Sequence, residues 1–345
     1  MTAQEMAMRP FLAKVAKGES LDTGEAREVF DLMMAGVATP AQIGALLMGL
    51  RVRGETTSEI AGGAMALREK ATALDAPDGA IDIVGTGGDG KGTFNVSTAT
   101  AFVVSACGVP VAKHGNRAVS SRSGSADVLK ALGVNIDADI DTVRQALFRA
   151  GICFMFAPRH HGAMRNVAAP RQEIGTRSVF NLLGPLANPA SVRRLLLGVY
   201  DRTLLEPFAE VLNLLGAERA WVVHGEDGID ELTVAGESFV AELDAGQVRS
   251  FTVTPEDAGL DRAAPEDLLG GDAQANAAAI RELFSGANGA YHKIVVLNAA
   301  AALVVAEVAD SLTDGAARAD SAIKSGAALE KLNALVEITN RSGSS

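Results

Sequence analysis

The sequence predicts an α/β protein in which a small N-terminal all-helical domain precedes a larger α/β domain with a central, mostly parallel sheet flanked by helices. Two observations support this fold class. Residues 1–75 carry only helical patterns, whereas short apolar segments alternate with helical stretches from Ile81 onward. The 345 residues, 48% hydrophobic and 21% charged, are enough for two domains with a sizeable core. We expect the helical domain at 1–75, joined by helices from about 170–190, and the α/β domain at 80–345.

Four helices are expected in the first domain, each for a local reason. Apolar residues recur at helical spacing from 6 to 15, and a second helix opens at 23–28. Pro40 is a favourable first residue for a third helix, and the residues at 57–59 cap a fourth. The segment 75–79 is rich in turn-forming residues and is expected to link the two domains.

The second domain is expected to alternate strands with helices. Strand-like segments lie at 81–84, 109–112, 152–156, 195–199, 221–224, 232–234, 239–243 and 248–253. Helices are expected near 125–132, 142–149, 203–215, 273–284 and 290–310, with two more before the end.

A glycine-rich loop follows the first of these strands. Five glycines lie within residues 85–92, and they allow tight turns and a close approach of the backbone to a ligand. Asn95, Ser97 and Thr98 then stand where an apolar helix begins, and each is a good N-cap residue. A strand, a glycine loop and a helix start present backbone N–H groups to an anion. The sequence therefore predicts a phosphate or pyrophosphate site here.

Two well-known motifs fit this loop only in part. Gly85, Gly87 and Gly90 match a dinucleotide-binding fingerprint, but no acidic residue lies between 89 and 127 to bind a ribose. A P-loop would need a hydroxyl residue where the chain has Gly92. A glycine-rich hairpin without a ligand is the third alternative, and the hydroxyl residues at the helix start argue against it.

The charge distribution also points to an anionic ligand. The net charge of −11 argues against a general nucleic-acid or membrane surface. Nevertheless, the segments 90–126 and 142–172 contain lysines and arginines but no carboxylate, where the average composition would place about eight acids. An acidic protein with two such segments is expected to enclose an anion.

Nothing in the sequence indicates secretion or a membrane span. The chain opens with an amphipathic helical pattern, and its longest apolar run, 294–306, is shorter than the ~20 residues that cross a bilayer. Cys107 and Cys153 both lie in apolar settings, which favours core residues in a reducing cytoplasm over a disulfide or metal site.

A second candidate anion loop occupies residues 113–125. It follows the strand at 109–112, so it is expected at the same sheet edge as the glycine loop. It combines a lysine, several serines, the small residues Gly115 and Gly124, and a helix start at Ser125. The alternative is a solvated basic loop, which the repeated hydroxyls make less favourable than a phosphate contact.

Taken together, these motifs resemble the anthranilate phosphoribosyltransferase family of tryptophan biosynthesis. The resemblance runs in order along nearly the whole chain and is carried by the segments 85–89, 95–98, 113–117, 156–161 and 179–189 and by Asp230-Glu231. It implies that the chain transfers the phosphoribosyl group of 5-phosphoribosyl 1-pyrophosphate to the amine of anthranilate.

The resemblance assigns two sets of substrate-binding residues. Anthranilate would contact Gly85, Asn116 and Arg171, because a guanidinium pairs well with the anthranilate carboxylate. A surface salt bridge with Glu173 is the alternative for Arg171. Phosphoribosyl pyrophosphate would contact Gly85, Gly88, Asp89, Thr93, Asn95, Val96, Ser97, Thr98, Lys113, His114, Gly115, Asn116, Arg117, Ala118, Val119, Ser120, Ser121 and Ser125.

The resemblance also implies Mg²⁺, with two ions per subunit, held by Ser97, Asp230 and Glu231. Neighbouring residues on a strand or helix point apart, so a shared site requires the acid pair to lie in a turn after the strand 221–224. Carboxylate oxygens suit Mg²⁺, which keeps water and substrate phosphates in its shell. If no pyrophosphate bound nearby, the pair Asp230-Glu231 would be better interpreted as part of a solvated loop. His160 and His161 lack zinc spacing and receive no catalytic role.

The implied reaction requires positioning more than acid–base catalysis, since the aromatic amine is nearly neutral and no catalytic triad or paired-carboxylate pattern is present. The resemblance also implies a homodimer packed through the helical domain and a hinge near 75–80.

Two other functions are possible for a related fold. Pyrimidine nucleoside phosphorylases usually carry an additional C-terminal domain and a Lys-His-Gly-Gly-like loop, whereas residues 113–116 of this chain read Lys-His-Gly-Asn. Nucleic-acid-binding relatives of this fold should be basic, whereas this chain has a net charge of −11, which argues against that alternative.

Overall fold

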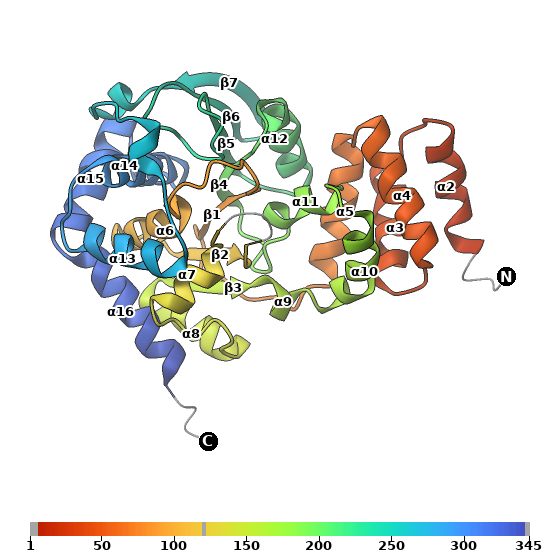
Figure 1. The fold of residues 1–345 in the computed structure, drawn as a ribbon, viewed down its shortest axis with the longest axis horizontal. Coiled ribbons are helices and arrows are strands. Elements are labelled where there is room, and N and C mark those ends of the chain that lie inside the picture. Colours follow the sequence, from red (N-terminus) through yellow and green to blue (C-terminus); the bar gives the residue numbers. More distant parts are fainter. Residues whose placement is uncertain (1–5, 119–121, 342–345) are drawn as a thin grey trace.

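The computed structural model describes residues 6–118 and 122–341 and shows a helical domain beside a larger α/β domain (Figure 1). The helical domain contains α2 (Arg9–Ala16), α3 (Thr23–Met34), α4 (Pro40–Arg53) and α5 (Thr57–Glu69). Three of these helices begin with a reciprocal capping box, in which the N-cap side chain and the third helical residue bond to each other's backbone, at Asp22/Glu25, Thr39/Gln42 and Thr56/Glu59. The fold class predicted from the sequence is confirmed.

The α/β domain is built on one seven-stranded sheet with the order β3-β2-β1-β4-β5-β6-β7. The first five positions in that order pair in parallel, and β6 and β7 are antiparallel additions at one edge. The strands are β1 (Ile81–Gly85), β2 (Val111–Gly115), β3 (Ile152–Phe156), β4 (Arg194–Gly198), β5 (Arg219–Gly225), β6 (Ser238–Asp244) and β7 (Gln247–Val253).

Helices cover both faces of this sheet. α6 and α14 are nearly uniform in apolar character and pack against the central strands, whereas α12 packs between the sheet and α5. The longer helices after β1 are α6 (Val96–Ala106), α7 (Ser125–Ala131), α8 (Ile140–Ala150), α10 (Arg165–Ile174), α12 (Leu205–Leu214), α13 (Ala273–Phe284), α14 (Ala290–Val305), α15 (Leu312–Lys324) and α16 (Ala327–Asn340). Short helical turns are α9 (Ala157–His160), α11 (Phe180–Leu183), η1 (Gly162–Met164), η2 (Gly184–Leu186), η3 (Arg202–Leu204), η4 (Pro255–Ala258) and η5 (Pro265–Leu268).

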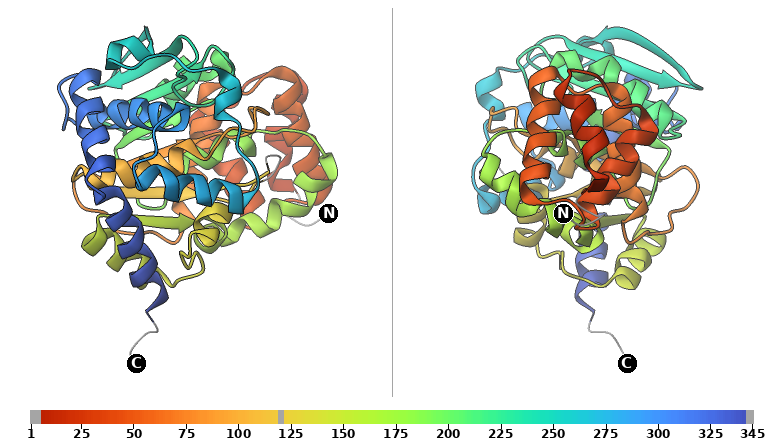
Figure 2. Two further views of the ribbon diagram at one scale, coloured as in Figure 1. Left: turned by 60° about the vertical axis from the view of Figure 1, so that its left-hand side comes forward. Right: turned by 90° about the vertical axis from the view of Figure 1, so that its right-hand side faces the viewer.

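The chain returns to the helical domain after β3. α10 packs on α3 and α4, and α11 packs on α5, so residues from the middle of the sequence lie against the first four helices. Figure 2 shows the helical domain at one end of the molecule, with α16 on the far side of the sheet. No helix in the described ranges is long and apolar enough to cross a membrane.

Two expected strands differ from the structure. The predicted strand at 232–234 is wrong: this buried segment has no strand partner, and Leu232 exchanges hydrogen bonds with the side chain of Asn298 instead, at 3.0 and 2.9 Å. The segment expected as a strand at 109–112 begins two residues later, at Val111. Pro110 has no N–H to donate to a strand ladder, which accounts for the later start.

Candidate active site

Four neighbouring strands of the sheet end in glycine at the same edge. These glycines are Gly85, Gly115, Gly198 and Gly225, at the ends of β1, β2, β4 and β5. A Cβ on Gly85 would lie 2.4 Å from Asp230 Oδ2, and one on Gly198 would lie 1.6 Å from the Asp230 carbonyl oxygen. The missing side chains therefore let the segment after β5 fold down onto the strand ends, beside the glycine loop.

The glycine loop adopts the backbone conformation that its sequence predicts. Gly87, Gly88, Gly90 and Gly92 have φ values of 63°, 74°, 73° and 67°, in the left-handed region that favours glycine. Directly after the loop, α6 begins at Val96. The loop thus brings backbone N–H groups and a helix N-terminus to the sheet edge, as an anion site requires.

The helix start differs in one respect from the expectation. Asn95 occupies the N-cap position of α6, but its side chain makes no capping hydrogen bond. Its Oδ1 instead accepts hydrogen bonds from Ser123 Oγ at 3.2 Å and from Asn276 Nδ2 at 2.8 Å. Asn95 therefore connects the two anion loops instead of capping its own helix.

The acid pair contacts this loop directly. Asp230 Oδ2 accepts a hydrogen bond from the Gly87 N–H at 2.7 Å, and Glu231 Oε1 accepts one from the Ser97 N–H at 3.2 Å. Burial, reinforced by the charge of Asp89, raises the pKa of Asp230 to about 6. Burial and the charge of Asp230 raise the pKa of Glu231 well above its usual value. The positive groups of the protein therefore do not fully compensate the burial of these two carboxylates.

This donor set fits a magnesium ion. Within residues 6–118 and 122–341, no three His, Cys, Asp or Glu side chains form a complete metal-binding group. Two carboxylates and the Ser97 hydroxyl would leave positions for water and substrate oxygens, which is how Mg²⁺ is usually held. Burial, with a smaller effect from neighbouring acids, raises both carboxyl pKa values, and a bound cation would favour the ionised form of each carboxyl.

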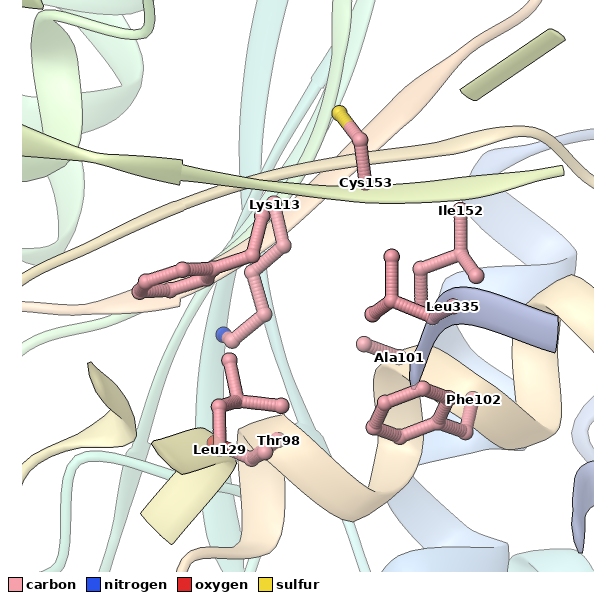
Figure 3. A pocket seen from close by; sticks show the side chains of 9 residues that line it. Thr98, Ala101, Phe102, Lys113, Leu129, Ile152, Cys153 and Leu335 are labelled. Atoms are coloured by element: carbon pink, nitrogen blue, oxygen red, sulfur yellow. The ribbon is translucent and has the colours of Figure 1, made fainter. Parts of the chain in front are cut away.

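Lys113 supplies the nearest buried positive group. Its side chain is 3% exposed, and Nζ donates hydrogen bonds to the Ile83 carbonyl oxygen and, at 3.3 Å, to Ser97 Oγ. In Figure 3 its aliphatic part runs along a small cavity whose other lining residues are all apolar except Thr98. Burial lowers the pKa of Lys113, and the charges of the nearby acids oppose that effect. The ammonium is therefore held at the start of α6.

The histidines next to this lysine are neutral. Burial, helped by the other histidines nearby, lowers the pKa of His114 to about 3 and that of His161 to about 4. Their rings lie 5.1 Å apart, centroid to centroid. His160 Nδ1 instead bonds to the Thr72 carbonyl oxygen at 2.7 Å. None of the three adds a positive charge near neutral pH.

The second loop is tied to the start of α7. Asp127 Oδ2 accepts hydrogen bonds from the N–H groups of Ala118 at 3.1 Å and Gly124 at 3.0 Å, and Ser125 Oγ donates to the Asn116 carbonyl oxygen at 3.3 Å. Asn116 is exposed. The predicted contacts Val119, Ser120 and Ser121 lie outside the described residues.

Arg171 lies on the helical-domain side of the site. Its guanidinium stacks on the Phe180 ring, with 4.9 Å between Cζ and the ring centroid, and that ring packs edge-on against Phe30 at 5.5 Å. In the part of the chain that the structure describes, Arg171 forms no ion pair, so Glu173 is not its partner. Its charge is available for a ligand.

The sequence motifs did not single out Arg177 or Asn276. The Arg177 guanidinium stacks on the Tyr200 ring, 3.7 Å from its centroid, and donates to the Gly87 carbonyl oxygen at 3.2 Å. Arg177 lies two residues before the motif at 179–189, and this proximity is the signal that could have identified it. Asn276 lies in a helix far along the chain, with no local pattern to mark it.

The structure brings most of the predicted residues to one sheet edge. Direct contacts link the glycine loop, the start of α6, Lys113 and the acid pair. Arg171 stands apart from this group, against α11. The arrangement can bind a highly charged anion with a divalent cation at the sheet edge and a second, carboxylate-bearing ligand toward α10.

Comparisons with known proteins agree with this geometry. Residues 77–329 match a family model described as "Glycosyl transferase family, a/b domain", and residues 9–71 match one described as "Glycosyl transferase family, helical bundle domain". An anthranilate phosphoribosyltransferase of Paramagnetospirillum magneticum is 60% identical over 334 residues, 97% of this chain and 96% of that protein.

Two solved structures of such enzymes are similar to this chain over nearly their whole length. The anthranilate phosphoribosyltransferase of Thermus thermophilus has a TM-score of 0.90 and 46% identity, covering 95% of this chain and 98% of that one. The enzyme of Saccharomyces cerevisiae, solved in complex with PRPP and Mg, has a TM-score of 0.88 and 26% identity, covering 97% and 98%.

Proposed function

The chain belongs to the anthranilate phosphoribosyltransferase family, and from this premise we propose that its site transfers the phosphoribosyl group of 5-phosphoribosyl 1-pyrophosphate to the amine of anthranilate. The products are N-(5-phosphoribosyl)anthranilate and pyrophosphate. One observation supports the assignment above all others: Asp230 and Glu231 bond directly to the glycine loop and to the start of α6. Acid side chains that contact an anion-binding backbone are expected where a metal–pyrophosphate complex binds.

The chain's own residues act by positioning and by electrostatics. Backbone N–H groups of the glycine loop and the Lys113 ammonium face the pyrophosphate, and the second loop covers the same substrate. Asn116 and Arg171 hold anthranilate so that its amine reaches the ribose C1 atom. Arg171 meets the carboxylate in the bidentate geometry that guanidinium groups favour.

The bond changes follow from this placement. The amine nitrogen forms a bond to C1 as the bond from C1 to the pyrophosphate oxygen breaks, with inversion at C1. The nitrogen then loses one proton, to the released pyrophosphate or to water. Bound magnesium, which we propose as two ions per subunit held by Ser97, Asp230 and Glu231, supplies charge that neutralises the leaving group. The neutral His114 and His161 add no competing cation.

The test of this function follows the fluorescence of anthranilate in the presence of phosphoribosyl pyrophosphate and Mg²⁺. We expect a loss of fluorescence that stops when Mg²⁺ is omitted. The Asp230→Asn variant is expected to need a higher Mg²⁺ concentration for activity. Asp227 is a neighbouring acid that accepts a hydrogen bond from Thr233 Oγ1 at 2.8 Å, and the Asp227→Asn variant should show the Mg²⁺ dependence of the wild type. If phosphoribosyl pyrophosphate binds but anthranilate is not consumed, the proposed phosphate site stands and the proposal that anthranilate is the acceptor is contradicted.

We also propose a homodimer that forms through the helical domain, in the cytoplasm. Met48 and Val52 lie one helical turn apart on α4 and are 37% and 81% exposed, which is unusual for apolar residues and supports a covered face. Both cysteines are free, which supports a reducing compartment.

Light scattering after size-exclusion chromatography tests the dimer. We expect twice the chain mass of 35.5 kDa for the wild type and a shift toward the monomer for Val52→Glu. Leu214→Glu, at an exposed apolar residue of α12, is the control and should remain dimeric. A monomeric wild type would contradict the proposal.

A further inference from the structure

A short segment before α13 lies along the glycine loop. The Phe94 N–H donates to the Leu268 carbonyl oxygen at 3.0 Å, and the Gly270 N–H donates to the Gly92 carbonyl oxygen at 2.9 Å. Thr93 and Leu269 form an isolated antiparallel bridge between these two contacts. The segment 268–271 is thus paired, backbone to backbone, with residues 92–94, although the two are far apart in the sequence.

Asn276 extends this pairing to the second anion loop. It lies in the first turns of α13 and is 2% exposed. Its Nδ2 donates to Asn95 Oδ1 at 2.8 Å and to Ser123 Oγ at 2.9 Å, and its Oδ1 accepts from the Gly271 N–H at 2.7 Å. One buried amide therefore links the glycine-loop side, the second-loop side and the segment 268–271.

The orientation of the Asn276 amide follows from its partners. The Gly271 backbone N–H can only donate, so the group that faces it must be the side-chain oxygen. The opposite end is then the NH₂ group, with two hydrogens for two acceptors. Glycine at position 270 permits this close packing, because a Cβ there would lie 2.8 Å from Asn276 Oδ1.

Asn95 is held from a second direction as well. Tyr291 Oη donates to the Asn95 carbonyl oxygen at 3.3 Å, and the Tyr291 ring packs on Phe94 with 4.5 Å between centroids. Asn95 precedes the α6 turn that contains Ser97, one of the proposed metal ligands. A displacement of Asn95 would move that turn relative to the second loop.

We propose that Asn276 is a positioning residue for the phosphoribosyl pyrophosphate site, which it serves by holding Asn95 and Ser123, one from each anion loop, in a fixed relative position. The inference rests on the function proposed above. A substrate that contacts both loops binds tightly only if the loops are already arranged, because the cost of ordering them is otherwise taken from the binding energy. Loss of the Asn276 donors is therefore expected to weaken this substrate specifically.

The variant Asn276→Asp tests the inference with little change in shape. The new side chain keeps an acceptor for Gly271 but loses both donors and faces two acceptor oxygens. Calorimetry with Mg²⁺ should show at least about a tenfold loss of affinity for phosphoribosyl pyrophosphate, as expected for one to two lost hydrogen bonds. The KM for phosphoribosyl pyrophosphate should rise by a similar factor, and the KM for anthranilate by less than about twofold.

Thr339→Val is the matched control. Thr339 is buried in α16, and its Oγ1 accepts from the Asn135 N–H at 3.2 Å, away from both anion loops. It should lose thermal stability while it keeps full affinity for the substrate. If Asn276→Asp loses no more affinity than this control, Asn276 has only a structural role and the inference is overturned.

A second variant covers the case in which Asn276→Asp does not fold. Tyr291→Phe keeps the aromatic packing on Phe94 and removes only the hydrogen bond to Asn95, so we expect about a threefold loss of affinity. Unchanged affinity in that variant would contradict the premise that the position of Asn95 controls substrate binding, and with it the inference. A wild type that binds phosphoribosyl pyrophosphate but does not consume anthranilate contradicts the proposed function instead, and the affinity ratios still decide the role of Asn276.

Discussion

At the scale of single residues, Asp82 shows how a charged group is accommodated below the site. It lies in β1, has no exposed surface, and accepts hydrogen bonds from Asn188 Nδ2 at 2.7 Å and from the His114 N–H at 3.2 Å. Burial nevertheless raises the pKa of Asp82 from 3.8 to about 6, because the attraction of Lys113 and these hydrogen bonds only partly offsets it.

This shift predicts how stability depends on pH. The folded pKa lies above the unfolded value, so the contribution of Asp82 is fully present below pH 3.8 and is lost as pH rises through about 6. Asp82→Asn removes this dependence. Relative to the variant, the wild type should lose up to about 3 kcal/mol of unfolding free energy between about pH 4 and pH 7. Urea unfolding at several pH values measures the difference, and parallel curves for the two proteins would contradict the shift.

Arg171 permits a second test at this scale. Arg171→Ala should raise the KM for anthranilate roughly 10- to 100-fold, the effect of losing a charged hydrogen-bonding partner, and change the KM for phosphoribosyl pyrophosphate little. Arg165→Ala, an exposed arginine at the start of the same helix, is the control and should change neither. An equal rise of both KM values would remove Arg171 from its proposed role.

At the scale of elements, the parallel strand register decides which segments meet. Gly85 of β1 pairs with Gly198 of β4, and Gly115 of β2 pairs with Phe156 of β3, so the loops that follow these strands start at one level. Glycine at the strand ends then allows the turn at Asp230 to rest on β1 and β4.

Gly198→Ala tests this packing. The new Cβ would lie 1.6 Å from the Asp230 carbonyl oxygen, so the segment carrying Asp230 must move. We expect about 1–3 kcal/mol lower stability and a weaker response to Mg²⁺ in the fluorescence assay. Gly162→Ala, where an added Cβ meets no atom within 4 Å, should leave both unchanged. Normal Mg²⁺ dependence in Gly198→Ala would show that the Asp230 position is not set by this contact.

At the scale of the whole molecule, the two domains are joined by several crossing contacts. The Thr72 N–H bonds to the His160 carbonyl oxygen at 2.8 Å, and the Leu74 N–H bonds to the Pro189 carbonyl oxygen at 3.2 Å. Arg68 on α5 donates to the carbonyl oxygen of Leu215, at the end of α12, at 3.3 Å. Figure 1 shows α10 and α11 beside the helical domain, so the proposed anthranilate ligand Arg171 is carried on the helical-domain side and the phosphate loops on the other.

Because the proposed ligands of the two substrates lie on different sides, we expect the domains to close over both substrates, with a hinge near 75–80. Small-angle scattering should show a smaller radius of gyration with pyrophosphate, Mg²⁺ and anthranilate together than with pyrophosphate and Mg²⁺ alone, because only anthranilate bridges the two sides. Pyrophosphate takes the place of the reactive substrate so that no turnover occurs. Identical scattering curves in the two conditions would count against closure.

Local patterns were sufficient for much of this molecule. The four helices of the first domain, the left-handed glycines of the loop at 85–92 and most of the order of strands and helices depend on interactions a few residues apart, so they can be predicted from the sequence. The exact caps were not all predicted: the cap expected at 57–59 is Thr56, one residue earlier. The absence of carboxylates from 90–126 and 142–172 likewise predicted an anion site at the sheet edge.

Long-range contacts decided the rest. Only the fold shows that Asn95 bonds to Asn276 instead of capping its helix, that Arg177 stacks against Tyr200 at the glycine loop, and that 232–234 bonds to Asn298 and forms no strand. Each of these pairs joins residues whose separation along the chain is large and variable, so no local spacing marks them. Sequence alone determined which chemistry the chain carries, whereas the sheet register and helix packing determined which residues hold that chemistry in place.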